Sequence, residues 1–380
     1  MADQDPVPTS ATSPKNASSP KSKSSPKSRA SPEGASPPGP DVETAVLPAD
    51  YWAQAQFDDD DDDDSALGAN SIHTDSTSLA SSIFQYRVIQ GRTFHGERGK
   101  AQYWGTNDEA QNEALDIVHH VLTLLLDGKL YLAPLKDDIK SAIDIGTGTG
   151  IWAIDFADQF PNAQVTGTDL SPIQPSWVPP NVYFQIDDCT QDWTFKPDST
   201  DFVHLRWLVG SVIDWDALMI EAFRTLAPGG YLESHEGSIY ITSDDGSVHD
   251  KTALSQWGPL FLEGGRRLGR PFLLLEQGII RSAMEAAGFV DIEVHDFKCP
   301  VGGWPRDEKL AEVGTYMRMA LDQDAEGAVL FTAHLQGWSK EEVLVYAARL
   351  RREMAQSRYH AYFRTQVVFG RKPEIQAPAA

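Results

Sequence analysis

Three glycines and one carboxylate have the spacing of a site that binds a nucleoside. Residues 141–150 read Ser-Ala-Ile-Asp-Ile-Gly-Thr-Gly-Thr-Gly, so Gly146, Gly148 and Gly150 follow directly after a short apolar run. Because these residues lack Cβ atoms, a ligand can lie against the backbone of the loop. Asp169 follows about 20 residues later, where a carboxylate can accept hydrogen bonds from both hydroxyls of an adenosine ribose.

The residues after the last glycine narrow the identity of the nucleoside. A phosphate-binding loop for ATP needs Lys and then Ser or Thr there, whereas Gly150 is followed by Ile151 and Trp152. The dinucleotide pattern G-x-G-x-x-G would need glycine at position 151. The actual spacing is D-x-G-x-G-x-G and begins at Asp144. ATP hydrolysis is therefore not favoured, and neither is a nicotinamide oxidoreductase, whose catalytic Tyr-x-x-x-Lys is also missing from the chain.

The elements that must position these residues alternate between strand and helix. A strand at 142–145 runs into the glycines, a helix from Ile151 stops at Pro161, and a strand at 164–168 ends on Asp169. This order is the nucleotide-binding half of a βαβ unit. The other expected elements are a helix from the N-cap Thr106 to Gly128, strands at 182–186 and 201–205, a helix at 215–226 leading into a fifth strand, a helix at 273–287, a strand at 290–297, helices at 307–322 and 339–356, and a strand at 360–369.

Four of these pieces, in this order, resemble the motifs of the class I S-adenosylmethionine-dependent methyltransferases. The loop that begins at Asp144 resembles the first motif, and Asp187-Asp188-Cys189 resembles the acidic end of the third strand. The strand entering Arg206-Trp207 resembles the fourth strand, where the family has the floor of the methyl-transfer site, and Pro228-Gly229-Gly230 resembles the turn into the fifth. Further blocks, at Gly91–His95, 168–180 and Pro300–Pro305, resemble the fungal LaeA-like methyltransferases, and the similarity extends roughly over residues 84–373.

The resemblance implies an α/β fold with a Rossmann-like sheet of seven strands in the order 3-2-1-4-5-7-6. It also implies a methyltransferase domain at 83–373, while the Ser-, Pro- and Asp-rich composition of residues 1–82 predicts a disordered tail, and we expect a disordered end at 374–380. Within the domain, we expect a helical cap at 83–135, a cofactor-binding core at 136–240, and substrate-side helices with the last strands at 241–373.

The resemblance further assigns the site. The methyl donor would be S-adenosyl-L-methionine, and no metal is expected. The residues expected to bind the donor are Tyr103, Asp144, Gly146, Thr147, Gly148, Gly150, Asp169, Leu170, Asp188, Cys189 and Arg206. Tyr103 and Trp104 offer aromatic surface to the sulfonium, with packing in the cap as the alternative.

Bases that could deprotonate a methyl acceptor are few. His235 and Glu236 follow the fifth strand, at the carboxyl edge where ligands bind in open α/β sheets, and we take them as the candidate catalytic residues. Structural hydrogen bonding is the alternative role for both.

Two functions remain open. The first is methyl transfer to a small molecule, a secondary metabolite. The second is a LaeA-like nuclear regulator of secondary metabolism that acts through protein partners of the velvet type, with weak or no small-molecule catalysis. The Thr147 position, where the regulator usually has Cys, favours the broader family of enzymes.

Composition sets the remaining limits. The chain has 380 residues and a formal charge of −23, which argues against direct binding of nucleic acid. No apolar run has the length of a membrane helix, and the two cysteines make neither a disulfide framework nor a zinc site, so we expect an intracellular protein of the cytoplasm or the nucleus. Five Ser-Pro steps and an Asp run at 58–64 lie in the expected tail, where a nuclear address and a purely solvating role are both open.

Overall fold

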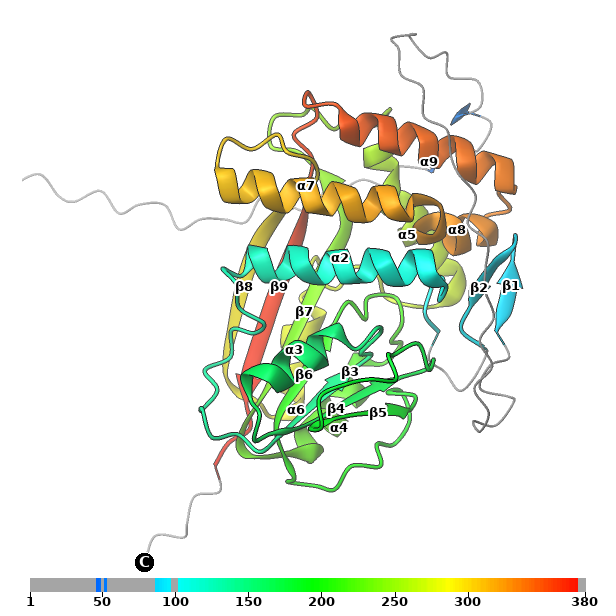
Figure 1. Cartoon of the computed structure of the whole chain (residues 1–380). Helices are drawn as coiled ribbons and strands as arrows, with labels where there is room; N and C mark the ends of the chain where they lie inside the picture. Colours follow the sequence, from blue (N-terminus) through cyan, green and yellow to red (C-terminus); the bar gives the residue numbers. More distant parts are fainter. Residues whose placement is uncertain (1–45, 49–50, 53–85, 97–101, 375–380) are drawn as a thin grey trace, which may run out of the picture. The chain divides into compact units, whose positions relative to one another are not determined.

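The computed structural model describes residues 46–48, 51–52, 86–96 and 102–374 (Figure 1). The Ser-Pro steps, the Asp run at 58–64 and residues 375–380 lie outside the described residues. Helices and strands keep the labels of Figure 1.

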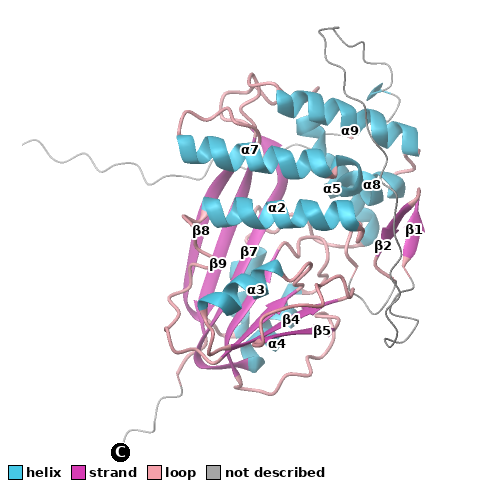
Figure 2. Ribbon diagram, in the orientation of Figure 1, coloured by secondary structure: helices cyan, strands magenta, loops and turns pink. Residues whose placement is uncertain are grey.

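A single sheet of seven strands forms the centre of the domain (Figure 2). Its strands lie in the order β5-β4-β3-β6-β7-β9-β8, which is 3-2-1-4-5-7-6 when they are counted along the chain, as predicted. The first five run parallel, and β9 lies antiparallel between β7 and β8. Their bounds are β3 Ser141–Ile145, β4 Gln164–Asp169, β5 Val182–Ile186, β6 Thr200–Arg206, β7 Leu226–Thr242, β8 Val290–Pro300 and β9 Tyr362–Arg371.

Helices connect the strands and also build a separate layer beyond their carboxyl ends. Figure 1 shows α2, α7 and α9 stacked side by side in this layer, and α2 packs on α7. The helices are α2 Glu109–Leu125, α3 Ile151–Gln159, α4 Trp215–Thr225, α5 Ala253–Leu268, α6 Ile279–Ala287, α7 Glu308–Gln323, α8 Ala325–Leu335 and α9 Lys340–Ala355.

The cap differs from the expectation in three respects. It contains a two-stranded hairpin, β1 Arg87–Ile89 and β2 Arg92–Phe94, in addition to helix α2. The N-cap of α2 is Asp108 rather than Thr106, because the Asp108 carboxylate accepts the hydrogen bond from the Gln111 backbone N–H. Trp52, which the sequence analysis placed in the tail, is buried against Tyr346 of α9.

The substrate-side helices also differ from the expectation. Helix α5 was not predicted, since its interior contains Pro259 and three glycines, all of which disfavour helix. Helix α8 was not predicted either. The helix expected at 273–287 begins only at Ile279, and the preceding Leu274 and Leu275 lie buried in the core as part of a turn.

Candidate functional site

The glycine loop between β3 and α3 has a backbone that only glycine adopts easily. Gly146, Gly148 and Gly150 have φ angles of 68°, 58° and 81°. A Cβ at Gly146 would also collide with the Leu208 side chain, and one at Gly150 with the Phe184 ring. The glycines are therefore needed both for the turn and for the close approach of neighbouring side chains.

The buried Asp144 side chain anchors this loop through hydrogen bonds. Its Oδ2 accepts a hydrogen bond of 2.6 Å from Thr147 Oγ1, and its Oδ1 lies 2.7 Å from His204 Nδ1. The His204 ring in turn stacks on Trp152, with 3.7 Å between the ring centroids. Because Asp144 is buried and both of its oxygens have protein partners, it shapes the loop rather than facing the cavity.

Asp169, at the carboxyl end of β4, faces the same loop. One of its oxygens accepts from the backbone N–H of Gly148 at 2.8 Å and the other from that of Ser171 at 3.0 Å. Burial raises the pKa of Asp169 to about 6, and these backbone N–H groups counter part of that effect. The carboxylate is therefore fixed in position at the edge of the sheet where the glycines lie.

A cavity opens above the glycine loop, with about 970 Å³ of empty space when the part open to solvent is included, and we call it the donor cavity. The predicted residues that line it are Tyr103, Gly146, Thr147, Gly148, Asp169, Leu170, Cys189 and Arg206. Asp144, Gly150 and Asp188 do not line it. Most of the residues predicted for donor binding thus meet in one place.

The two acids after β5 make different contacts, and the one that lines the donor cavity is not the one predicted. Asp187 lines the donor cavity, whereas the Oδ1 of Asp188 accepts hydrogen bonds from the backbone N–H and the hydroxyl of Thr190. Cys189 also lines the cavity, and burial raises the pKa of its thiol to about 12, so the thiol is not a nucleophile at neutral pH.

Arg206, at the end of β6, carries the positive charge of the donor cavity. Its Nη1 lies 3.1 Å from Nδ1 of His119 on α2, and the other ring nitrogen of His119 lies 2.9 Å from Asp155 on α3. Burial lowers the pKa of Arg206 to about 10, so the guanidinium remains charged at neutral pH. This row of side chains fixes the orientation of the cation toward the cavity.

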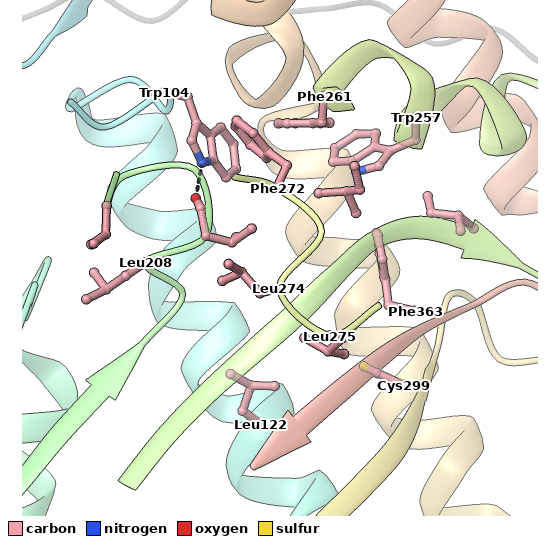
Figure 3. Packing of buried hydrophobic residues seen from close by; sticks show 14 of the residues in the cluster. Trp104, Leu122, Leu208, Trp257, Phe261, Phe272, Leu274, Leu275, Cys299 and Phe363 are labelled. Carbon is pink, nitrogen blue, oxygen red and sulfur yellow. Dashed lines mark hydrogen bonds between the residues drawn. The ribbon is translucent and has the colours of Figure 1, made fainter. Parts of the chain in front are cut away.

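A second cavity lies next to the first, and we call it the acceptor cavity. The two cavities share four side chains, Tyr103, Leu115, Val118 and Trp207. The walls that belong to the acceptor cavity alone come mainly from the helical layer and the ends of β7 and β9, and include Trp104, Trp257, Phe261, Met317 and Phe363. Figure 3 shows Trp104, Phe261, Trp257 and Phe363 gathered on this side of the core.

Trp207 stands at the junction of the two cavities and was not predicted as a site residue. Its φ angle of 56° is rare for a residue with a bulky side chain, and such strain is concentrated at functional sites. Its Nε1 is buried and has no hydrogen-bond partner among the described residues. The sequence signal was only its place directly after a strand of the sheet, because a positive φ angle leaves no mark on a tryptophan.

The two candidate bases lie behind the cavities. His235 is buried with Nε2 3.1 Å from Thr365 Oγ1, and burial lowers its pKa to about 3. Both carboxylate oxygens of Glu236 accept backbone N–H groups, from Leu208 and Val209 at 3.0 Å each, and burial raises its pKa to about 8. Neither residue lines either cavity. These contacts match the structural alternative, and a role as base stays a prediction.

His95 also reaches the donor cavity although it was not assigned to the site. Its Nδ1 lies 2.6 Å from Oγ of Ser171, whose own backbone N–H holds Asp169. The Gly91–His95 block was noticed only as part of a resemblance, so its contact with the loop after β4 could not be foreseen. Among the described residues, no group of three or more His, Cys, Asp or Glu side chains could hold a metal ion.

Comparisons with known proteins agree with this geometry. Residues 117–294 match the family model of a methyltransferase domain. The chain is 39% identical over 315 residues to methyltransferase pytC of Aspergillus terreus, covering 81% of this chain and 95% of that one. It is 31% identical over 299 residues to the probable methyltransferase tdiE of Emericella nidulans (78% and 92%). It is 32% identical over 292 residues to the secondary metabolism regulator LAE1 of Cochliobolus heterostrophus (75% and 94%).

The sheet order, the glycine loop and the acid at the end of β4 define a class I S-adenosylmethionine-dependent methyltransferase. Within that class, the relatives show that the chain belongs to the LaeA-like methyltransferases. The predictions of family, fold and enzyme class are thereby confirmed. In the described part of the chain, no helix has both the length and the apolar character needed to cross a membrane.

Proposed function

We propose that this protein transfers the methyl group of S-adenosylmethionine to a small molecule held in the acceptor cavity. The observation that carries the proposal is the wall shared by the two cavities. Because of this wall, the mostly apolar acceptor cavity lies directly beside the cavity at the glycine loop. Relatives named as methyltransferases cover nearly the whole length of the domain, which supports the same reading.

The residues of the donor cavity fit this methyl donor. The backbone of Gly148 has room where a Cβ would stand and would lie against the ligand, and the Asp169 carboxylate would accept hydrogen bonds from the ribose hydroxyls. Asp187 and Cys189 would lie beside the adenine, and the Arg206 guanidinium is suited to a carboxylate such as that of the methionine part.

This methyl transfer needs little acid or base catalysis from the protein. The donor supplies a methyl group on a sulfonium, which leaves as a neutral thioether. The protein must therefore align the two reactants and exclude water. Tyr103 and Trp207 stand where the two cavities meet and can present aromatic faces to the sulfonium. Ser238, which lines the acceptor cavity and donates to Glu276 Oε1 at 2.6 Å, offers a path for a proton released by the acceptor.

Calorimetry with S-adenosylmethionine tests the donor site directly. Asp169→Ala should weaken binding by about 1–3 kcal/mol, because charge-assisted hydrogen bonds to the ribose are lost. Asp158→Ala, at an exposed position of α3, is the matched control and should bind like the wild type. If the folded wild-type protein shows no measurable binding, the proposal fails.

A regulatory role in the nucleus is the second candidate, because the relatives include a protein named as a secondary metabolism regulator. Such a role would use protein partners, of the velvet type by resemblance, and the Ser-Pro tail. Deleting residues 1–44 removes the Ser-Pro steps but keeps Trp52. Unchanged nuclear localisation and unchanged recovery of partners after this deletion would count against a tail-dependent regulator.

A further inference from the structure

The residues that line the acceptor cavity indicate what kind of molecule it could bind. Six aromatic side chains line it: Tyr103, Trp104, Trp207, Trp257, Phe261 and Phe363. Phe261 lies at the centre of this group, with ring centroids 4.8 Å from Trp104 and 5.1 Å from Trp257. Trp104 is held in place by a hydrogen bond of 2.8 Å from its Nε1 to the Val209 carbonyl. Trp104 is therefore fixed in the wall, with Phe261 packed edge-on against it.

The cavity offers no free charge to a ligand. No lysine, arginine or histidine is among its described lining residues. Its one carboxylate is that of Asp324, which is buried, and Arg92 donates to both of its oxygens, at 2.8 and 2.9 Å. The backbone N–H of Gly327 donates to the same carboxylate at 3.0 Å. A charged ligand would thus lose its hydration without gaining a partner.

One polar group at the junction lacks a partner. Trp207 Nε1 is buried without a hydrogen-bond acceptor among the described residues, and Trp207 lines both cavities. A buried N–H without a partner is costly, and a ligand oxygen would relieve that cost. The Nε1 atom is covered by its neighbours, so a small turn of the Trp207 ring would bring this N–H to an oxygen of an acceptor held where the cavities meet.

We propose that the methyl acceptor is an uncharged aromatic molecule that carries an oxygen, and that Trp207 Nε1 donates a hydrogen bond to this oxygen. The inference rests on the proposed function, because it assigns the occupant of the acceptor cavity. The aromatic wall supplies stacking and edge contacts to a flat ring system, and the lack of a free cation among the described lining residues disfavours carboxylated or phosphorylated acceptors.

The test uses the full chain saturated with S-adenosylhomocysteine and follows the fluorescence of a bound probe. 2-Naphthol is an uncharged aromatic with one oxygen, 2-naphthoate is a similar ring with a negative charge, and naphthalene lacks the oxygen. We expect 2-naphthol to bind at least about tenfold more tightly than 2-naphthoate. Trp207→Phe keeps a ring but removes the N–H, and should weaken 2-naphthol about fivefold while leaving naphthalene unchanged.

Two further variants locate the probe. Ala320 on α7 is buried in the cavity wall, and its neighbour Met319 is exposed. Ala320→Trp fills the cavity and should abolish binding of 2-naphthol, whereas Met319→Trp should not change it. Binding of S-adenosylhomocysteine by each variant shows that it is folded.

Three results would overturn the inference: equal affinity for 2-naphthol and 2-naphthoate, equal effects of Ala320→Trp and Met319→Trp, or no binding of 2-naphthol by protein that binds S-adenosylhomocysteine. In each case the donor site would stand and only the acceptor class would be wrong. Failure to bind S-adenosylhomocysteine would instead count against the proposed function itself.

Discussion

Two features of the Asp169 site have opposite effects on the pKa of its carboxylate. The carboxylate is half-buried, which favours the protonated form, and two backbone N–H groups donate to it, which favours the ionised form. The net effect is a pKa raised to about 6. Binding of a ribose diol asks for the ionised form, because only a carboxylate accepts hydrogen bonds from both hydroxyls.

Donor affinity should therefore fall as the pH falls through about 6. Below that value the folded protein binds a proton at Asp169 that the ligand must displace. We expect binding of S-adenosylhomocysteine to be about tenfold weaker at pH 5 than at pH 8. Calorimetry across this range measures the effect. Asp169→Asn, which cannot ionise, should bind more weakly at pH 8 and show a flat profile, and a flat profile in the wild type would refute the assignment.

The residues of the donor loop were predictable because their chemistry is local. Gly146, Gly148 and Asp169 follow strands directly, and the spacing of a βαβ unit brings them together. Asp188 was chosen over Asp187 by counting from the end of a strand, where a shift of one residue decides which of the two side chains lines the cavity. Trp207 was missed because its role depends on a backbone angle and on the second cavity, both of which arise from tertiary packing.

At the scale of elements, Arg92 of β2 joins three parts of the molecule. It makes ion pairs with Asp108, the N-cap of α2, and with Asp324, the N-cap of α8, at 2.5 and 2.8 Å. Asp324 is almost fully buried. The hairpin thus holds the starts of two helices that line the acceptor cavity.

Removing the Arg92 guanidinium should lower the free energy of unfolding. Arg92→Met leaves Asp324 buried without its counterion, and we expect a loss of about 3–5 kcal/mol in the free energy of unfolding. Arg281→Met breaks an exposed pair with Glu285 on α6 and should cost less than about 1 kcal/mol. Urea denaturation of both variants makes the comparison. Adding Asp324→Asn to Arg92→Met should recover part of the loss, and equal stability of the two single variants would contradict this role for the ion pairs.

The sheet was predictable from sequence, whereas much of the helical layer was not. Strands β3, β4 and β5 are short runs that end at or just before a glycine or an acid, and the family's order then fixes the neighbours. Helix α5 keeps its glycines because neighbours need the space: a Cβ at Gly258 would collide with the Tyr240 ring and one at Gly264 with Thr332. Such packing reasons lie outside the periodicity of the segment itself.

At the scale of the whole molecule, a short N-terminal piece is part of the core. Trp52 is 2% exposed and packs edge-on against Tyr346, with 5.4 Å between the ring centroids. The backbone N–H of Leu47 donates to Gln256 Oε1 on α5 at 2.8 Å. The predicted tail at 1–82 therefore contains residues that belong to the domain.

Two changes near the N-terminus should differ clearly in their effect on the free energy of unfolding. Deleting residues 1–44 keeps these contacts and should change the free energy of unfolding by less than about 1 kcal/mol. Trp52→Ala in the full chain removes a buried ring and should cost about 3–5 kcal/mol. Thermal denaturation of both proteins checks the prediction. If the deletion destabilises as much as the substitution, residues before Val46 also contribute to the core.

The wall between the two cavities imposes a condition on how the enzyme works. Tyr103 and Trp207 line both cavities, so a ligand that fixes either ring from one side would change the affinity on the other. Thermodynamic reciprocity requires that the factor be the same in both directions. The two reactants are then not independent variables in the rate law: the apparent Michaelis constant for one depends on the concentration of the other, and neither constant describes the enzyme alone.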